Sequence, residues 1–197
     1  MYTADALEEN MLEKVLLKGE SLPEYELLDD TGAKVTLRQY WEKQKTIFVF
    51  LRHFGCQHCR AQAVQYSRAR LLFEEAGLGV VFIGLGDVKQ AKEFREEFFI
   101  PYPVLFDPTK QIYKQFQLLK VSPIKEMQPS SFINAIRDTA KYGAAIPKQS
   151  ARQLGGVFIA DTNGRLVYVF RSERASIFPD VEDTLEYARE PSAVYPQ

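Results

Sequence analysis

Two cysteines and two histidines form the most reactive part of this sequence, and all four lie in one short stretch. The chain has 197 residues; its only cysteines are Cys56 and Cys59, and its only histidines are His53 and His58. A disulfide between the two cysteines would close a very short loop and could stabilise a fold only slightly. A disulfide framework of a secreted protein would spread its cysteines widely instead. The spacing therefore predicts chemistry at the pair, either redox or metal binding.

The elements expected around the pair give the two sulfurs different tasks. A buried strand is predicted to end near Leu51, Gly55 permits a sharp turn, and a helix is predicted to begin at about Cys56. Unpaired N–H groups and the positive dipole end at a helix start stabilise a thiolate. Cys59 lies one turn deeper, where it can attack a mixed disulfide formed at Cys56. We expect an accessible Cys56 thiolate as the attacking group and a less exposed Cys59 as the resolving thiol.

Basic side chains surround the pair in the sequence. Arg52, His53, His58 and Arg60 add positive or potentially positive charge that favours a thiolate at Cys56. Arg52 and His53 are the candidate catalytic partners of the two cysteines. The alternatives stay open, because a histidine here can simply bond the local backbone and the arginines can be surface charges.

Metal ligation is the main alternative for the cysteine pair. The clustering of Cys and His favours it, but a structural zinc usually takes four protein ligands, and a second ligand pair is missing. Helix-forming residues follow Cys59, and the adjacent His58 and Cys59 would point in different directions on that helix. Inert thiols are the third interpretation.

A βαβ unit is expected to position the pair. The ranges 46–51 and 80–85 are continuous apolar runs rich in β-branched and aromatic residues, which is typical of central parallel strands. Good helix formers fill 57–76 between them, and Gly77 supplies a stop. Asp87 can cap a second helix. Ligands meet open parallel sheets at the carboxyl ends of the strands, which is where the cysteines fall.

Antiparallel elements are expected on both sides of that unit, and the whole chain 1–197 is predicted to be a single domain. We expect an N-terminal helix within 1–20. We also expect an inserted helix with flanking loops at 122–152. The remaining predictions are a hairpin of 25–28 with 34–37, a short strand at 104–106, a tight Asn-Gly hairpin of 157–160 with 166–170, and a terminal helix over 179–188.

Bulk composition excludes several classes of protein. Hydrophobic residues make up 46% and charged residues 26%, which excludes intrinsic disorder. The 25 Lys plus Arg balance 26 Asp plus Glu, so no electrostatic footprint for nucleic acid or an anionic membrane exists. The longest apolar stretch is far shorter than the roughly 20 residues of a bilayer span. Residues 1–10 lack the layout of a secretory signal, so we expect a cytoplasmic protein without nucleic-acid or membrane partners.

A helix-opening C-x-x-C after a central strand, followed by a ββα ending, resembles the thioredoxin superfamily. More narrowly, the chain resembles the AhpC/TSA peroxiredoxin-like branch that includes relatives of selenoprotein U. The resemblance implies an α/β thioredoxin-like fold with a central mixed sheet, and an attacking role for Cys56 with a resolving role for Cys59. It covers roughly 20–190 and is carried by the segments Leu22–Leu27, Val49–Cys56, Val104–Pro108 and Gly156–Asp161.

Some positions depart from the family pattern. A typical peroxiredoxin has Pro seven residues and Thr three residues before its peroxidatic cysteine, where this chain has Val49 and His53. The resemblance also implies a peroxide-polarising Arg and, in thioredoxins, a cis-Pro just before the penultimate strand. Arg152 and Gly155 occupy that region, so they join Gly55 as candidate substrate-binding residues. The departures favour disulfide exchange over dedicated peroxide reduction.

The sequence as a whole predicts a thiol-dependent oxidoreductase. We expect Cys56 to attack a disulfide or hydroperoxide, Cys59 to resolve the adduct, and an external thiol of thioredoxin or glutathione type to regenerate the pair. No cofactor or metal is required by this scheme, and a homodimer is compatible with it. A metal-binding module and a non-catalytic thioredoxin-fold interaction module remain as alternatives.

Overall fold

The computed structural model describes residues 16–121 and 152–189, which share one seven-stranded mixed sheet. The strand order is β2-β1-β5-β4-β3-β6-β7; the β3–β4 and β4–β5 pairs are parallel and the other four pairs are antiparallel. This arrangement confirms the predicted α/β fold, with a βαβ unit followed by ββα. The strands are β1 (Glu26–Asp29), β2 (Lys34–Thr36), β3 (Thr46–Phe50), β4 (Gly79–Gly84), β5 (Val104–Phe106), β6 (Gly156–Ala160) and β7 (Leu166–Arg171).

Strand β3 is buried along its whole length because both faces of the sheet are covered there. All five of its residues are buried. Successive side chains of a strand point to opposite faces, so Val49 enters one hydrophobic core whereas Phe48 and Phe50 enter the other. Leu51, the first residue after the strand, belongs to the same core as Val49.

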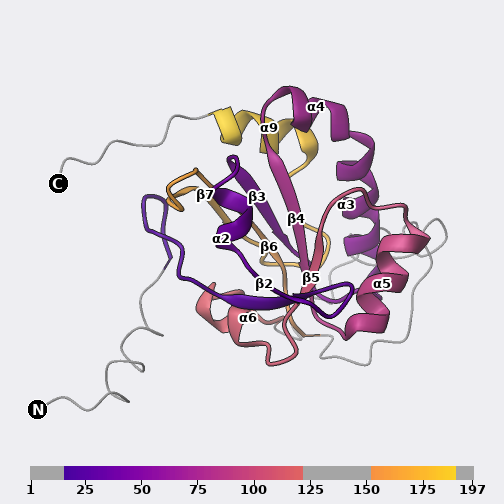
Figure 1. Ribbon diagram of the computed structural model, residues 1–197. Coiled ribbons are helices and arrows are strands. Elements are labelled where there is room, and N and C mark those ends of the chain that lie inside the picture. The colour runs from indigo at the N-terminus through magenta and orange to yellow at the C-terminus, as the bar shows by residue number, and fades with distance from the viewer. Residues whose placement is uncertain (1–15, 122–151, 190–197) are drawn as a thin grey trace, which may run out of the picture.

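Helices cover the two faces unequally (Figure 1). The buried residues of α3, α4, α5 and α9 pack into the core that contains Val49, and those of α2 and α6 pack into the core that contains Phe50. The cysteines and the residues of α6 therefore lie on opposite faces of the sheet. The helices are α2 (Arg38–Trp41), α3 (Gln57–Arg68), α4 (Arg70–Glu75), α5 (Val88–Glu97), α6 (Gln111–Gln115) and α9 (Val181–Arg189).

The helix predicted over 57–76 is divided in two. Ala69, with φ −86° and ψ 14°, ends α3, and α4 begins at the next residue. The Ser67 hydroxyl donates a hydrogen bond to the Ala63 carbonyl at 2.8 Å, a local bond of the kind that bends helices. Gly77, at φ 68°, ends α4 as expected.

The hairpin of β6 and β7 is wider than the predicted two-residue turn. Among its turn residues only Gly164 has a positive φ, of 76°, so Asn163 does not take the second left-handed position. The Asp161 carboxylate closes the loop by accepting hydrogen bonds from the N–H groups of Asn163 and Arg165, both at 2.9 Å. The side chain of Asp161 thus replaces the backbone geometry that a tight Asn-Gly turn would supply.

Part of the predicted organisation lies outside the described residues, namely most of the N-terminal helix and nearly all of the 122–152 insertion. Residues 16–20 at the end of the predicted helix are not helical. Gly19, at φ 91°, turns the chain there, and its N–H bonds to the Leu166 carbonyl at 2.7 Å. The single-domain organisation of 1–197 therefore stays a prediction.

Candidate active site

Cys56 lies at the start of α3, as the sequence predicts. It is the N-cap residue, with φ −78° and ψ 121°, and its N–H donates to the His53 carbonyl at 3.1 Å. The N–H of Arg60 bonds back to the Cys56 carbonyl at 3.0 Å, which closes the first helical turn. Gly55, in the turn before it, is not among the described glycines with a positive φ. The turn therefore does not depend on the conformational freedom of glycine at position 55.

The loop between β3 and α3 is held by an aromatic ring that lies against two glycines. A Cβ added to Gly84 would lie 2.4 Å from the Phe54 ring, and one added to Gly86 would lie 2.5 Å from it. On α5, the Phe94 ring lies 5.3 Å from the Phe54 ring, centroid to centroid. Because Phe54 is two residues before Cys56, this packing fixes the place of the sulfur relative to β4.

Both cysteines are free thiols, and both are buried. Cys56 is 3% exposed and Cys59 is 0% exposed. The order of exposure agrees with the predicted roles, but we expected Cys56 to be accessible, and it is not. Its side chain belongs to the hydrophobic core that also contains Phe54. A substrate can therefore reach the sulfur only if its neighbours move.

Arg52 contacts both sulfurs. Its backbone N–H donates to Cys59 Sγ at 3.2 Å, and its Nη1 lies 3.9 Å from Cys56 Sγ. Its Nε donates to the backbone carbonyl of Gln153 at 2.9 Å, which holds the buried guanidinium in place. The sequence analysis predicted a role for Arg52 but not for Gln153, because every residue has a backbone carbonyl and the residue type therefore does not reveal such an acceptor.

The two thiols ionise very differently. The pKa of Cys56 falls from 9.0 to about 6, chiefly because its sulfur accepts a hydrogen bond from the Cys59 thiol; burial opposes this fall, and Arg52 assists it. Burial raises the pKa of Cys59 well above its ordinary value, and the hydrogen bond it gives to Cys56 raises it further. At neutral pH the pair is therefore a Cys56 thiolate that a Cys59 thiol stabilises.

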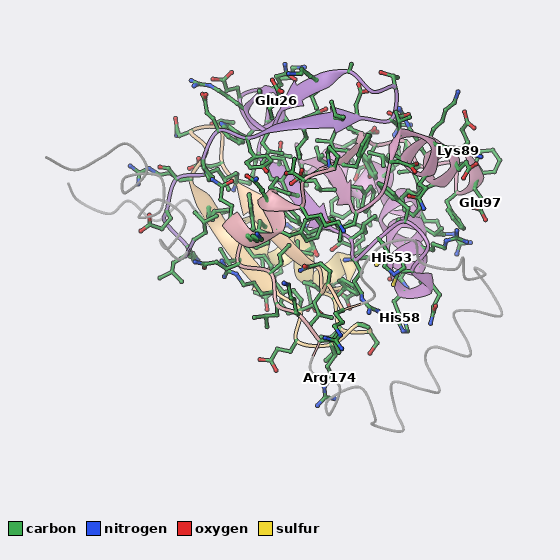
Figure 2. The ribbon with its side chains drawn as sticks, turned by 90° about the horizontal axis from the view of Figure 1, so that it is seen from below. Glu26, His53, His58, Lys89, Glu97 and Arg174 are labelled. Carbon is green, nitrogen blue, oxygen red and sulfur yellow. The ribbon has the colours of Figure 1, made fainter. Side chains whose placement is uncertain are left out.

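The two histidines and Arg60 contribute unequally to this site. Burial lowers the pKa of His53 to about 4, with Arg52 and Arg60 adding to the fall, so His53 is neutral at pH 7 and supplies no positive charge. Its buried Nδ1 has no hydrogen-bond partner. His58 lies in the first turn of α3 (Figure 2) and makes a small contribution to lowering the pKa of Cys56. Arg60 instead donates to the Phe54 carbonyl at 3.2 Å and lies 3.5 Å from Glu97.

Alkylation of reduced protein by iodoacetamide is expected to follow an apparent pKa near 6, because only the thiolate reacts. The rate should fall as the pH drops below 6 and level off above 7. Arg52→Met should move the midpoint upward, since it removes a cation beside Cys56 Sγ. Arg60→Met, which removes a guanidinium bonded to Phe54 and Glu97, is the matched control. Equal midpoints in all three proteins would contradict the assigned role of Arg52.

The candidate substrate-binding residues Gly155 and Arg152 differ in setting. Gly155 is buried; a Cβ on it would lie 2.1 Å from the Phe50 carbonyl oxygen, and its own carbonyl accepts from the Ser172 N–H at 3.0 Å. No cis peptide bond occurs in the described part of the chain. Arg152 is exposed and precedes the Gln153 that holds Arg52. Gly155 thus serves close packing against β3, whereas Arg152 has a side chain accessible to solvent.

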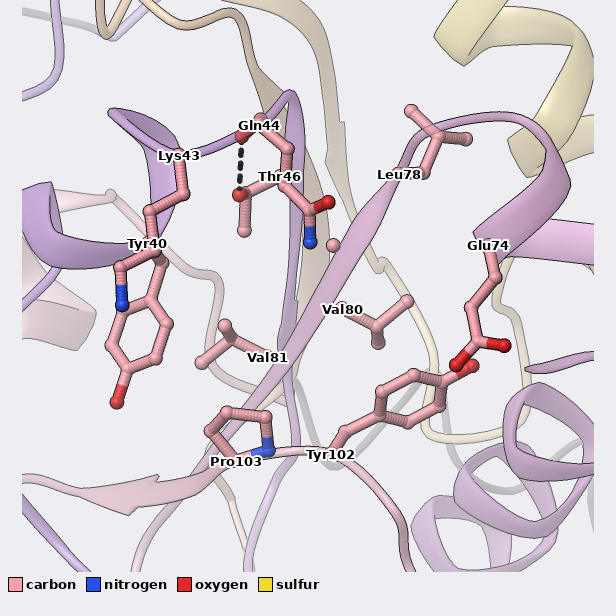
Figure 3. A pocket seen from close by; sticks show the side chains of 11 residues that line it. Tyr40, Lys43, Gln44, Thr46, Glu74, Leu78, Val80, Val81, Tyr102 and Pro103 are labelled. Carbon is pink, nitrogen blue, oxygen red and sulfur yellow. Dashed lines mark hydrogen bonds between the residues drawn. The ribbon is translucent and has the colours of Figure 1, made fainter. Parts of the chain in front are cut away.

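A separate pocket of about 180 Å³ lies at the other end of the sheet (Figure 3). Its lining includes Thr46 and Gly79, the first residues of β3 and β4, together with Tyr40, Lys43 and Tyr102. It contains none of the predicted site residues, and the two cysteines lie beyond the opposite, carboxyl end of β3. The pocket is therefore distinct from the thiol site.

In residues 16–121 and 152–189, no group of three or more His, Cys, Asp or Glu side chains is placed to hold a metal ion. Across the same residues, no helix has the length and apolar character needed to traverse a bilayer.

Solved structures of other proteins share this fold. Peroxidoxin BcpB from Mycobacterium tuberculosis matches with a TM-score of 0.65 and 19% identity, covering 91% of this chain and 98% of that one. A mutant form of peroxiredoxin 6 from Arenicola marina matches with a TM-score of 0.67 and 14% identity, covering 87% of this chain and 71% of that one. These likenesses show a thioredoxin-like fold of the peroxiredoxin kind.

The family follows from the sequence comparison. The model of the AhpC/TSA family matches residues 18–169, so the chain belongs to the AhpC/TSA family, which confirms the resemblance. A chloroplastic thioredoxin-like protein, AAED1, from Arabidopsis thaliana is 25% identical over 176 residues, 85% of this chain and 71% of that protein. Prostamide/prostaglandin F synthase from Danio rerio is 30% identical over 131 residues, 66% of this chain and 61% of that protein. Membership of this family supports a redox function in general terms.

Proposed function

We propose that this protein is a thiol-dependent oxidoreductase in which Cys56 attacks the substrate and Cys59 resolves the adduct. The observation that carries the proposal is the pairing of a thiolate at a helix start, with a pKa of about 6, and a protonated thiol one turn deeper in the same helix. Such a pair supplies both the nucleophile and the second thiol that a two-step exchange needs.

With a disulfide substrate, the Cys56 thiolate forms a bond to one sulfur and the other sulfur leaves as a thiolate. Cys59, once deprotonated, attacks Cys56 Sγ and releases the first sulfur, so that the substrate is reduced by two electrons and the pair becomes a disulfide. An external thiol of thioredoxin or glutathione type then reduces that disulfide. No cofactor takes part in this cycle.

With a hydroperoxide, the same thiolate attacks the outer oxygen and the O–O bond breaks. Cys56 becomes a sulfenic acid, an alcohol leaves after protonation, and attack by Cys59 then forms the disulfide and releases water. Family membership favours peroxides as substrates. The missing Thr and Pro of typical peroxiredoxins favour disulfides, so both classes belong to the proposal.

Other residues take supporting roles in this scheme. Arg52 stabilises the Cys56 thiolate, and its position depends on the Gln153 carbonyl. The neutral His53 has an unpartnered Nδ1 that can hydrogen-bond a substrate oxygen once the site opens. Gly55, which is half-buried, can offer the substrate its backbone, whereas Gly155 is buried against β3 and acts only through packing; Arg152 is a cation that a carboxylate or peroxide group can meet. A cytoplasmic location and a homodimer remain predictions.

Two assays on purified protein separate the substrate classes. With dithiothreitol as reductant, insulin disulfide reduction and cumene hydroperoxide consumption are measured at pH 7, and we expect turnover in at least one assay. Thiol counting by mass spectrometry should then show a Cys56–Cys59 disulfide. Absence of turnover with both substrates would contradict the proposal. Stoichiometric zinc that is lost in Cys59→Ser would instead establish a metal-binding module.

A further inference from the structure

The N–H that donates to Cys59 is part of the peptide group between Leu51 and Arg52, and the carbonyl of the same peptide group also makes a hydrogen bond. The N–H of this peptide donates to Cys59 Sγ at 3.2 Å. Its carbonyl, that of Leu51, accepts from the Tyr113 hydroxyl at 2.6 Å. The peptide is trans, so its N–H and C=O point in opposite directions. Cys59 and Tyr113 therefore lie on opposite sides of one peptide, in the cores on the two faces of the sheet.

Tyr113 is held firmly in this place. It is 1% exposed, and its ring lies edge-on to Phe50 with 5.5 Å between centroids. Its hydroxyl also lies 3.0 Å from the Ile83 carbonyl, at the end of β4. The helix that carries it, α6, is fixed by Asp107, whose carboxylate accepts from the Ile112 N–H at 2.8 Å. The hydroxyl is thus directed at the ends of the two parallel strands before the thiol site.

A hydrogen bond to the oxygen of a peptide polarises the whole group and makes its N–H a stronger donor. We propose that Tyr113 is a positioning residue for Cys59, because through the Leu51–Arg52 peptide its hydroxyl strengthens the hydrogen bond that the resolving sulfur accepts. The inference rests on the proposed function, since it concerns the second step of that exchange. Tyr113 would thus support Cys59 although it is 54 positions away in the sequence and lies on the other face of the sheet.

The bond matters most when Cys59 carries a negative charge. Cys59 is completely buried, and burial disfavours its thiolate. Cys56 and Arg52 are the charged or titratable groups that shift the pKa of Cys59. Tyr113 lies on the far side of the Leu51–Arg52 peptide, where Asp107 and Cys59 both raise its own pKa. The Arg52 N–H compensates part of the cost of burial. Loss of the Tyr113 hydroxyl should therefore raise the pKa of Cys59 and slow resolution, while attack by Cys56 is barely affected.

The test uses 4,4′-dithiodipyridine, which separates the two steps. The Cys56 thiolate attacks one sulfur and releases one thiopyridone; Cys59 then attacks Cys56 Sγ, forms the protein disulfide and releases a second. Stopped-flow absorbance resolves both releases from pH 5 to pH 10. In Tyr113→Phe the second release should be about two- to fourfold slower at pH 7. A smaller fraction of Cys59 is then ionised, and the somewhat greater nucleophilicity of its thiolate offsets only part of that loss. The rate profile of the second release should shift to higher pH, and the first release should stay the same.

Tyr66→Phe is the matched control. Tyr66 is also fully buried, and its hydroxyl also bonds a carbonyl, that of Pro179, at 3.2 Å, but it does not contact the peptide before Arg52. An unshifted second release in Tyr113→Phe would overturn the inference. So would equal slowing of both variants at every pH, since that is what loss of packing alone produces. Absence of the first release in the wild-type protein would overturn the proposed function, and this inference with it.

Discussion

Cys56→Ser is expected to abolish turnover with disulfide and hydroperoxide substrates, by more than about 10³-fold, because a serine hydroxyl is not ionised at neutral pH. The starting state is unusually favourable for attack, since the Cys56 pKa of about 6 makes the thiolate its main form at pH 7. Steady-state assays at pH 7 measure the loss. Turnover within tenfold of wild type would show that Cys56 is not the attacking group.

Cys59→Ser is the matched variant for this result, because it leaves the attacking sulfur in place. It should allow one round of attack and then trap a mixed disulfide or a sulfenic acid at Cys56, visible by mass spectrometry. The Cys59 thiol is also the main cause of the low pKa of Cys56. Cys59→Ala leaves no donor at that position, so the alkylation midpoint of Cys56 should rise in that variant. The same defect in Cys56→Ser and Cys59→Ser would contradict the division of roles.

Gly155→Ala is expected to lower the free energy of unfolding by about 3 kcal/mol or more, a large effect for one methyl group. The added Cβ would lie 2.1 Å from the Phe50 carbonyl oxygen. That atom belongs to the backbone of the central strand, so no change of rotamer relieves the clash. The strands β3 and β6 would have to separate near Arg52. Urea unfolding of the reduced protein, followed by tryptophan fluorescence, measures the change.

Gly77→Ala provides the comparison for that variant. Gly77 has φ 68°, and a Cβ there meets no atom within 4 Å. The substitution should cost only about 1 kcal/mol, the usual strain of an L-residue in the left-handed region. If Gly155→Ala lowered the free energy of unfolding by no more than Gly77→Ala does, β3 and β6 would have adjusted to the extra methyl group.

Local patterns account for the parts of the fold that the sequence predicted correctly. The apolar runs that become β3 and β4 had the composition of covered parallel strands. Asp87 was expected to cap α5, and it does so through a hydrogen bond from the Gln90 N–H at 2.9 Å. The position of Cys56 at the start of α3 followed from the same reasoning, because strand, turn and helix signals are adjacent there.

Contacts between distant segments account for what the sequence could not predict. The Gln153 carbonyl that holds Arg52 is 101 residues away, and backbone acceptors leave no mark in the sequence. The Tyr113 hydroxyl reaches the site from the opposite face of the sheet. The neutrality of His53 and the burial of Cys56 depend on how tightly the loop packs. Composition alone gives no measure of that packing.

The hydrogen bond between the two sulfurs has a consequence for the direction of electron flow. Whatever stabilises the Cys56 thiolate stabilises the dithiol form and not the disulfide, in which neither sulfur bears a charge. A protein that favours its dithiol form has a high reduction potential. The Cys56–Cys59 disulfide is therefore expected to be a ready electron acceptor, which ordinary cellular thiols can return to the dithiol state without a specialised donor.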